Sequence, residues 1–308
     1  MTSHTAKLTP EQAEALRGIL AKRDFESAEV PHAVFSYKRP KLAITWYKSG
    51  KLLIQGKGTQ EFVEFTLEPE LLGQAAFADA LDAQPEQLEP RLGVDESGKG
   101  DFFGPLVVAG VYVNEPVARA LDGLGVKDSK AIASDKKIAA LAKGIRDMPG
   151  CVYSVVPIGN ASYNRLHQKM RNVNKILAWG HARVIENLLG QRDRMNPEPL
   201  RAISDQFARS KATIQSALME EGRQLKLVQM HKAESDIAVA AASILARDLF
   251  VQRLSALGRE FDLELPKGAS SKVDAAGAAF LKKHGMDKLG QAAKLHFRTT
   301  QKIQAGLL

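Results

Sequence analysis

Cysteine and long apolar runs are scarce in this chain. Of its 308 residues only Cys151 is a cysteine, so an internal disulfide and a CxxC zinc site are both excluded. The most apolar run, residues 237–246, is far shorter than the roughly 18 residues needed to cross a bilayer. Residues 1–5 lead directly into polar sequence, which does not fit a signal peptide. These absences predict a cytoplasmic protein without a membrane anchor.

The charge of the chain is positive and unevenly distributed. The hydrophobic share of 44% supports a folded core, and 43 basic against 35 acidic residues give a net charge of +8. Residues 1–90 carry a net charge of −3 and the remainder carries +11, a balance that attracts polyanions. Within the acidic first part, residues 30–60 hold no acid and six bases, which are Lys38, Arg39, Lys41, Lys48, Lys51 and Lys57. This cluster indicates either a solvated face or a binding surface.

Residues 1–84 predict a small α+β domain. A capping box at residues 9–12 predicts a helix to about residue 22. Alternating apolar residues predict strands at 41–47, 51–55 and 61–67, followed by a helix at about 70–83. The face opposite the core is expected to show Lys41, Thr45, Tyr47, Lys51, Gln55 and Lys57. Basic side chains beside an aromatic one favour nucleic acid, with Tyr47, Lys48, Lys51 and Lys57 as the candidate contacts.

A proline-containing linker at residues 85–91 separates this domain from a second one at 92–308. Here short apolar strands are interspersed with helical patterns, which predicts an α/β sheet with helices on its faces. The expected strands are 91–95, 106–113, 151–158, 200–205 and 225–230. The expected helices are 161–169, 174–189 and 236–257.

Residues 93–105 resemble the phosphate-binding template GxxxxGK but fail it in three ways. Gly100 occupies the place of the hydroxyl residue that should hold Mg²⁺. Asp95 and Glu96 would lie against phosphate oxygens, and Pro105 interrupts the helix that should begin there. An ATPase is therefore disfavoured.

The adjacent acids of this segment favour a metal site instead. Carboxylates at the end of an apolar strand are costly to bury without a cation, and hard divalent cations prefer oxygen ligands. On a regular strand Asp95 and Glu96 point to opposite faces, so the following glycines would have to supply a twist. The alternative is a plain acidic turn. Further acids that end elements are Asp205, Glu234 and Asp236, the last equally suited to cap a helix.

Two other features carry weaker signals. The loop at residues 97–100 exposes backbone N–H groups that suit a phosphate or a ribose hydroxyl. His181 and His231 do not have the spacing of a metal site, and His181 is interpreted as an ordinary helix residue.

The combination of motifs resembles the type 2 ribonucleases H. The segments that carry the resemblance are GVDESGKG with FGPLV at residues 93–107, KDSK at 127–130 and AAASILAR at 240–247. Within that group the ribonuclease HIII family is most similar, because Glu234 stands where ribonuclease HII has Asp and because an N-terminal domain is present. Further segments similar to that family are 44–56, 163–166, 172–174 and 178–182.

This resemblance implies a ribonuclease-H-like mixed sheet in residues 92–308 and a TATA-binding-protein-like substrate-binding domain in residues 1–84. It implies cleavage of RNA paired with DNA, leaving 5′-phosphate and 3′-hydroxyl ends. The implied ligands of two Mg²⁺ or Mn²⁺ ions are Asp95, Glu96, Asp205 and Glu234, which leaves Asp236 as a cap.

The expected partner is an RNA/DNA hybrid, and the protein is expected to be a monomer without an obligate protein partner. The expected contacts near the cut are Ser97, Gly98, Lys99, Gly100 and Lys130. Two alternatives stay open at this point. One is cleavage at single ribonucleotides in DNA, as in ribonuclease HII. The other is a non-catalytic nucleic-acid-binding protein, which leaves the four acids unexplained.

Overall fold

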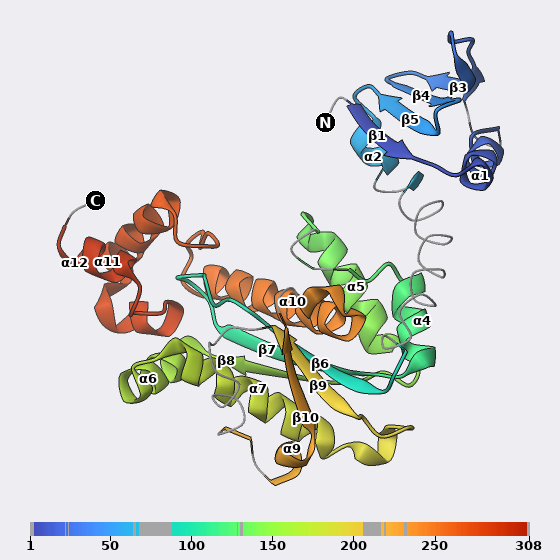
Figure 1. Ribbon diagram of the computed structural model, residues 1–308. Coiled ribbons are helices and arrows are strands. Elements are labelled where there is room, and N and C mark those ends of the chain that lie inside the picture. The colour runs from blue at the N-terminus through green and yellow to red at the C-terminus, as the bar shows by residue number, and fades with distance from the viewer. Residues whose placement is uncertain are drawn as a thin grey trace. The chain divides into compact units, whose positions relative to one another are not determined.

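The chain forms two compact units, Met1–Gln84 and Pro85–Leu308, in a computed structural model (Figure 1). The residues it describes are 3–21, 23, 25–63, 66–67, 88–127, 129, 132–205, 217–218, 220–230 and 233–306. In this described part, no helix combines the length and the apolar character needed to cross a membrane.

The first unit is an antiparallel sheet with strand order β1-β5-β4-β3-β2. Its strands are β1 (Ser3–Lys7), β2 (Glu26–Ser27), β3 (Ala33–Arg39), β4 (Leu42–Tyr47) and β5 (Lys51–Gln55), and its helices are α1 (Pro10–Ala21) and α2 (Thr59–Phe62). The predicted alternation in β4 and β5 is confirmed, because Leu42, Ile44, Leu52 and Ile54 are all buried. They pack in one core with Leu16 of α1.

Two predictions for this unit need correction. The strand predicted at 61–67 is wrong, since α2 occupies Thr59–Phe62 and the other described residues of this stretch, 63 and 66–67, are helical as well. The reason is a helical spacing of the buried residues, which are Phe62, Val63, Thr66 and Leu67. Thr45 lies on the predicted open face but is buried, with its hydroxyl 2.8 Å from that of Ser36. Strands β1, β2 and β3 were not predicted, and the helix expected at 70–83 falls outside the described residues.

The second unit is a five-stranded mixed sheet with order β10-β9-β6-β7-β8, so the predicted fold class is confirmed. Strand β6 pairs antiparallel with β7 and parallel with β9. The strands are β6 (Arg91–Ser97), β7 (Leu106–Val113), β8 (Val152–Ile158), β9 (Arg201–Asp205) and β10 (Lys226–Met230). The helices are α4 (Glu115–Gly123), α5 (Asp135–Asp147), α6 (Asn160–Met170), α7 (Val173–Leu189), α9 (Glu220–Gln224), α10 (Ile237–Glu260), α11 (Ser271–Ala292) and α12 (Arg298–Gln304), with 3-10 turns η4 (Arg192–Arg194) and η5 (Ala233–Ser235).

Helices α10 and α7 cover opposite faces of this sheet (Figure 1). Glycines on the central strands allow both helices to approach closely. A Cβ atom at Gly93 of β6 would lie 2.2 Å from the carbonyl carbon of Ala238 in α10, and one at Gly110 of β7 would lie 2.5 Å from Val184 in α7. The central strands are therefore sandwiched tightly, and their side chains alternate between the two helices.

Candidate functional site

Asp95 and Glu96 lie in the second half of β6 and point to opposite faces of the sheet. The ladder between β6 and β7 is regular here, with Asp95 opposite Ala109 and Glu96 opposite Val108, so no bulge separates the two acids. Asp95 accepts a hydrogen bond from Ser243 of α10, whereas Glu96 lies against His181 of α7. Each acid is thus supported by a different helix.

The environment of Asp95 disfavours the ionised form of its carboxyl group relative to the protonated form. Burial, followed by the negative charge of Glu96, raises its pKa to about 7, and the bond from Ser243 opposes this only partly. The Ser243 hydroxyl is in turn 2.6 Å from the buried hydroxyl of Ser129. A buried acid in this position gains from a nearby cation, which would restore its charge.

Glu96 is held in its ionised form. Burial alone would raise the pKa of this carboxyl, but the hydrogen bond and charge of His181, together with Lys99, outweigh it and lower the pKa. The distances are 3.0 Å from His181 Nε2 to Oε2 and 3.6 Å from Lys99 Nζ to Oε1. Both carboxylate oxygens therefore face a nitrogen.

Asp205 ends β9, the parallel neighbour of β6. The last paired position is Val94 with Ser204, so Asp205 follows at the same sheet edge as Asp95. Glu234 lies in η5, which packs against β9 and the start of α10. Asp236 is the N-cap of α10, as its Oδ1 accepts from the Ala238 N–H at 2.9 Å.

The acids are not assembled into a complete ligand set. Across the described part of the chain, no group of three or more His, Cys, Asp and Glu side chains lies close enough to hold a metal ion. Asp205 and Glu234 both lie near segments outside the described residues, 206–216 and 231–232. The chemistry of the donors nevertheless fits a hard divalent cation, because all four are carboxylates and Asp95 is buried beside a second negative charge.

The glycine-rich loop after β6 is fixed by buried hydrogen bonds. A Cβ atom at Gly98, where φ is 91°, would lie 2.2 Å from the Pro105 carbonyl oxygen, so only glycine fits. Lys294, which is fully buried, donates to the carbonyls of Asp101 at 2.9 Å and Gly104 at 2.6 Å. Lys99 and Gly100 are exposed, while Lys130 lies outside the described residues.

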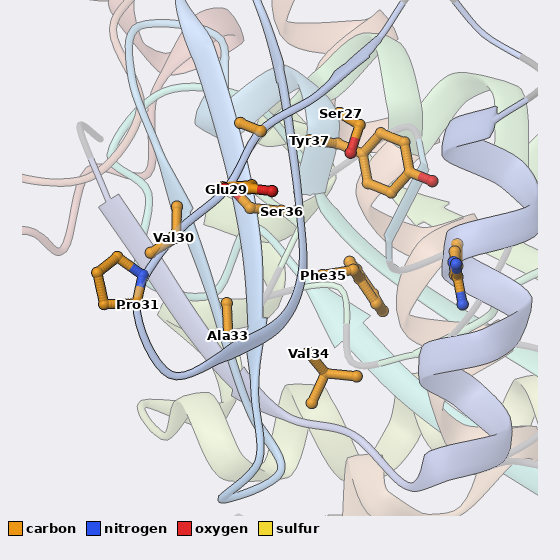
Figure 2. A pocket seen from close by; sticks show the side chains of 11 residues that line it. Ser27, Glu29, Val30, Pro31, Ala33, Val34, Phe35, Ser36 and Tyr37 are labelled. Atoms are coloured by element: carbon orange, nitrogen blue, oxygen red, sulfur yellow. The ribbon is translucent and has the colours of Figure 1, made fainter.

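The predicted contacts of the first unit lie on β4, β5 and the turns beside them. Lys48, Lys51 and Lys57 are exposed and Tyr47 is half-buried. The hollow drawn in Figure 2, about 600 Å³ in volume, is a different feature. It is lined by Arg17 of α1 and by residues of 27–37, and it includes none of these four side chains.

Comparison with known proteins identifies the family. A model of the ribonuclease HII family matches residues 92–300, and one described as a domain of unknown function matches residues 4–72. The chain is 44% identical over 303 residues to ribonuclease HIII of Chlamydia pneumoniae, with 97% of each chain covered. The chain belongs to the ribonuclease HIII family. Ribonuclease HIII of Protochlamydia amoebophila is 43% identical over 94% of this chain and 93% of its own.

Solved structures of the ribonuclease HIII family agree with this assignment. A crystal structure of Bst-RNase HIII in complex with Mn²⁺ matches with a TM-score of 0.65 and 33% identity, covering 99% of this chain and 98% of that one. RNase H3 of Aquifex aeolicus matches with a TM-score of 0.53 and 26% identity, covering 95% of this chain and 99% of its own. The resemblance to the ribonuclease HIII family is confirmed.

The sequence interpretation missed His181 as a partner of Glu96. The signal was present in the helical pattern, since His181 shares the buried stripe of α7 with Ala178, Ala182 and Ile185. A polar side chain in such a stripe needs a hydrogen-bond partner, and here that partner is an acid of the site.

Proposed function

We propose that this chain hydrolyses the RNA strand of RNA/DNA hybrids and leaves 5′-phosphate and 3′-hydroxyl ends. Membership of the ribonuclease HIII family makes it a ribonuclease H, and the observation that supports the chemistry best is the buried acid pair in β6. A net charge of +11 over residues 91–308 favours a polyanionic substrate.

The proposed ligands of the catalytic cations, Mg²⁺ or Mn²⁺, are Asp95, Glu96, Asp205 and Glu234. A complex with Mn²⁺ is known for Bst-RNase HIII, which supports a divalent ion here. Two ions held by these carboxylates would supply activation of the attacking water and stabilisation of the leaving 3′-oxygen. In the chain itself, Asp95 and Glu96 supply the negative charge at the end of β6, and they are contacted by Ser243 of α10 and His181 of α7, respectively.

The remaining roles concern substrate binding. The turn at residues 97–100 is proposed to meet the backbone and the 2′-hydroxyl beside the cut, with Lys99 adding a positive charge. Residues 1–84 are proposed as a TATA-binding-protein-like domain that binds the hybrid through Tyr47, Lys48, Lys51 and Lys57, and 85–91 as the linker to the catalytic domain at 92–308. Lys130, the cytoplasmic location and the monomeric state stay predictions.

The test is a cleavage assay with Asp95→Asn, which keeps the shape of the side chain and removes its charge. Cleavage of a uniform hybrid in Mg²⁺ or Mn²⁺ is expected to be abolished while hybrid binding is retained. Asp262→Asn is the matched control, because that side chain is 95% exposed and is expected to leave activity unchanged. Full turnover by Asp95→Asn contradicts the metal assignment.

A duplex with one embedded ribonucleotide, assayed in parallel, separates the alternatives. The proposed function predicts that the uniform hybrid is the better substrate. Preferential cutting of the single ribonucleotide identifies an activity like that of ribonuclease HII, and binding without any cleavage identifies the non-catalytic alternative.

A further inference from the structure

We infer that His181 is a positioning residue that holds Glu96 in one orientation before a cation binds. This inference rests on the proposed function, since it assigns a role within the same site. Among the contacts that Glu96 makes, the one with His181 is the shorter and the more deeply buried, at 3.0 Å with His181 fully inaccessible to solvent.

The position of His181 follows from the packing of α7 on β7. The preceding residue, Gly180, lies over Val108 so closely that a Cβ atom would be 2.8 Å from a Val108 methyl group. Val108 is the ladder partner of Glu96. Because Gly180 brings the helix onto this point of the strand, the next side chain of α7 reaches the neighbouring Glu96.

The chemistry of the contact defines which nitrogen carries a proton. An ionised carboxylate has only acceptor oxygens, so Nε2 of His181 must carry the hydrogen and donate it to Oε2. Lys99 approaches the other oxygen, but at 3.6 Å and from a side chain that is 41% exposed. His181 is therefore the buried and closer support of Glu96, and Lys99 is the more distant one, exposed to solvent.

Partners that orient a metal ligand from behind affect the affinity for the metal. Removing such a partner commonly costs about 10–100-fold in metal affinity or activity. His181→Leu removes the hydrogen-bond donor and puts an apolar side chain of similar size in its place. It is expected to weaken Mn²⁺ binding by that factor. His181→Gln, which can place an N–H at a similar reach, is expected to restore most of the loss.

The experiment titrates Mn²⁺ into the full-length protein by calorimetry, without substrate, and measures hybrid cleavage over a range of Mn²⁺ concentrations. We expect His181→Leu to bind Mn²⁺ more weakly than the wild-type protein. We also expect its cleavage rate to approach the wild-type rate as the Mn²⁺ concentration rises. Leu188→Met is the control, because it changes a buried residue of α7 that packs near Gly110 and not at Glu96. If His181→Leu does not fold, His181→Ala replaces it, with the same expected result.

The outcomes separate the two proposals. Wild-type cleavage combined with unchanged Mn²⁺ affinity in a folded His181→Leu or His181→Ala variant overturns the role of His181 alone. An equal loss in Leu188→Met also overturns it, because the effect then comes from helix packing. Absence of hybrid cleavage by the wild-type protein overturns the proposed function, and this inference with it.

Discussion

Replacing Gly93 by alanine perturbs the contact that sets the distance between β6 and α10. An added Cβ atom would lie 2.2 Å from the carbonyl carbon of Ala238, 2.3 Å from the Val239 nitrogen and 2.6 Å from the Ala238 side chain. Two of these three atoms belong to the helix backbone, so no side-chain rotation relieves the clash. The helix must move away from the strand instead.

The size of that movement determines the cost. Ordinary contact begins at 3.4 Å, so the backbone of α10 must retreat by about 1 Å in a closely packed interior. Overpacking of this kind costs about 3 kcal/mol, the upper part of the usual range. In a unit of this size each kcal/mol lowers Tm by about 2–4 °C, which predicts a decrease of roughly 6–12 °C.

Differential scanning calorimetry of the full-length protein measures this decrease. The matched control is Gly123→Ala at the end of α4, where an added Cβ atom meets nothing within 4 Å, so Tm is expected to stay unchanged or to rise slightly. Cleavage by Gly93→Ala is expected to fall as well, because α10 carries Ser243 to Asp95. A Tm within about 2 °C of the wild-type value would refute the packing argument.

Two further predictions concern charge. Burial, opposed by Asp101, lowers the pKa of Lys294 from 10.5 to about 7, so the unfolded chain binds a proton between these pH values that the folded chain lacks. The free energy of unfolding should therefore rise from pH 7 to 9 by up to about 1.4 kcal/mol per pH unit. Urea titrations of Lys294→Met should show a smaller rise, and an equal rise in both proteins contradicts the prediction. Lys51→Ala and Lys57→Ala should each lower the slope of log binding constant against log salt concentration by roughly one, whereas Arg17→Ala on α1 should leave it unchanged; equal slopes refute the binding surface.

Elements with a strong periodic pattern were predictable from the sequence. β4 and β5 alternate cleanly, β7 is apolar throughout, and the start of α10 is apolar on all sides because it lies between the sheet and helices α5 and α4. The failure at residues 61–67 has a physical cause, since a short apolar run satisfies the strand and the helix spacing equally well.

For the site, the sequence predicts residue types but not their geometry. The assignment of the four acids rests on motif resemblance and stays a prediction, and local pattern does not show which helix faces each acid. The contact between Glu96 and His181 joins positions 85 residues apart, and the link from Asp95 to Ser243 depends on where α10 crosses the sheet. Such contacts follow from the three-dimensional packing.

The bonds from Lys294 to the loop carbonyls also constrain the order of events during synthesis. They join Lys294 to Asp101 and Gly104 across 193 and 190 positions of the chain. The chain must therefore leave the ribosome at least as far as Lys294 before this turn acquires its final shape. A nascent chain interrupted before the end of α11 would carry all four proposed ligand acids and still lack Lys294, so the turn beside them would not yet be ordered.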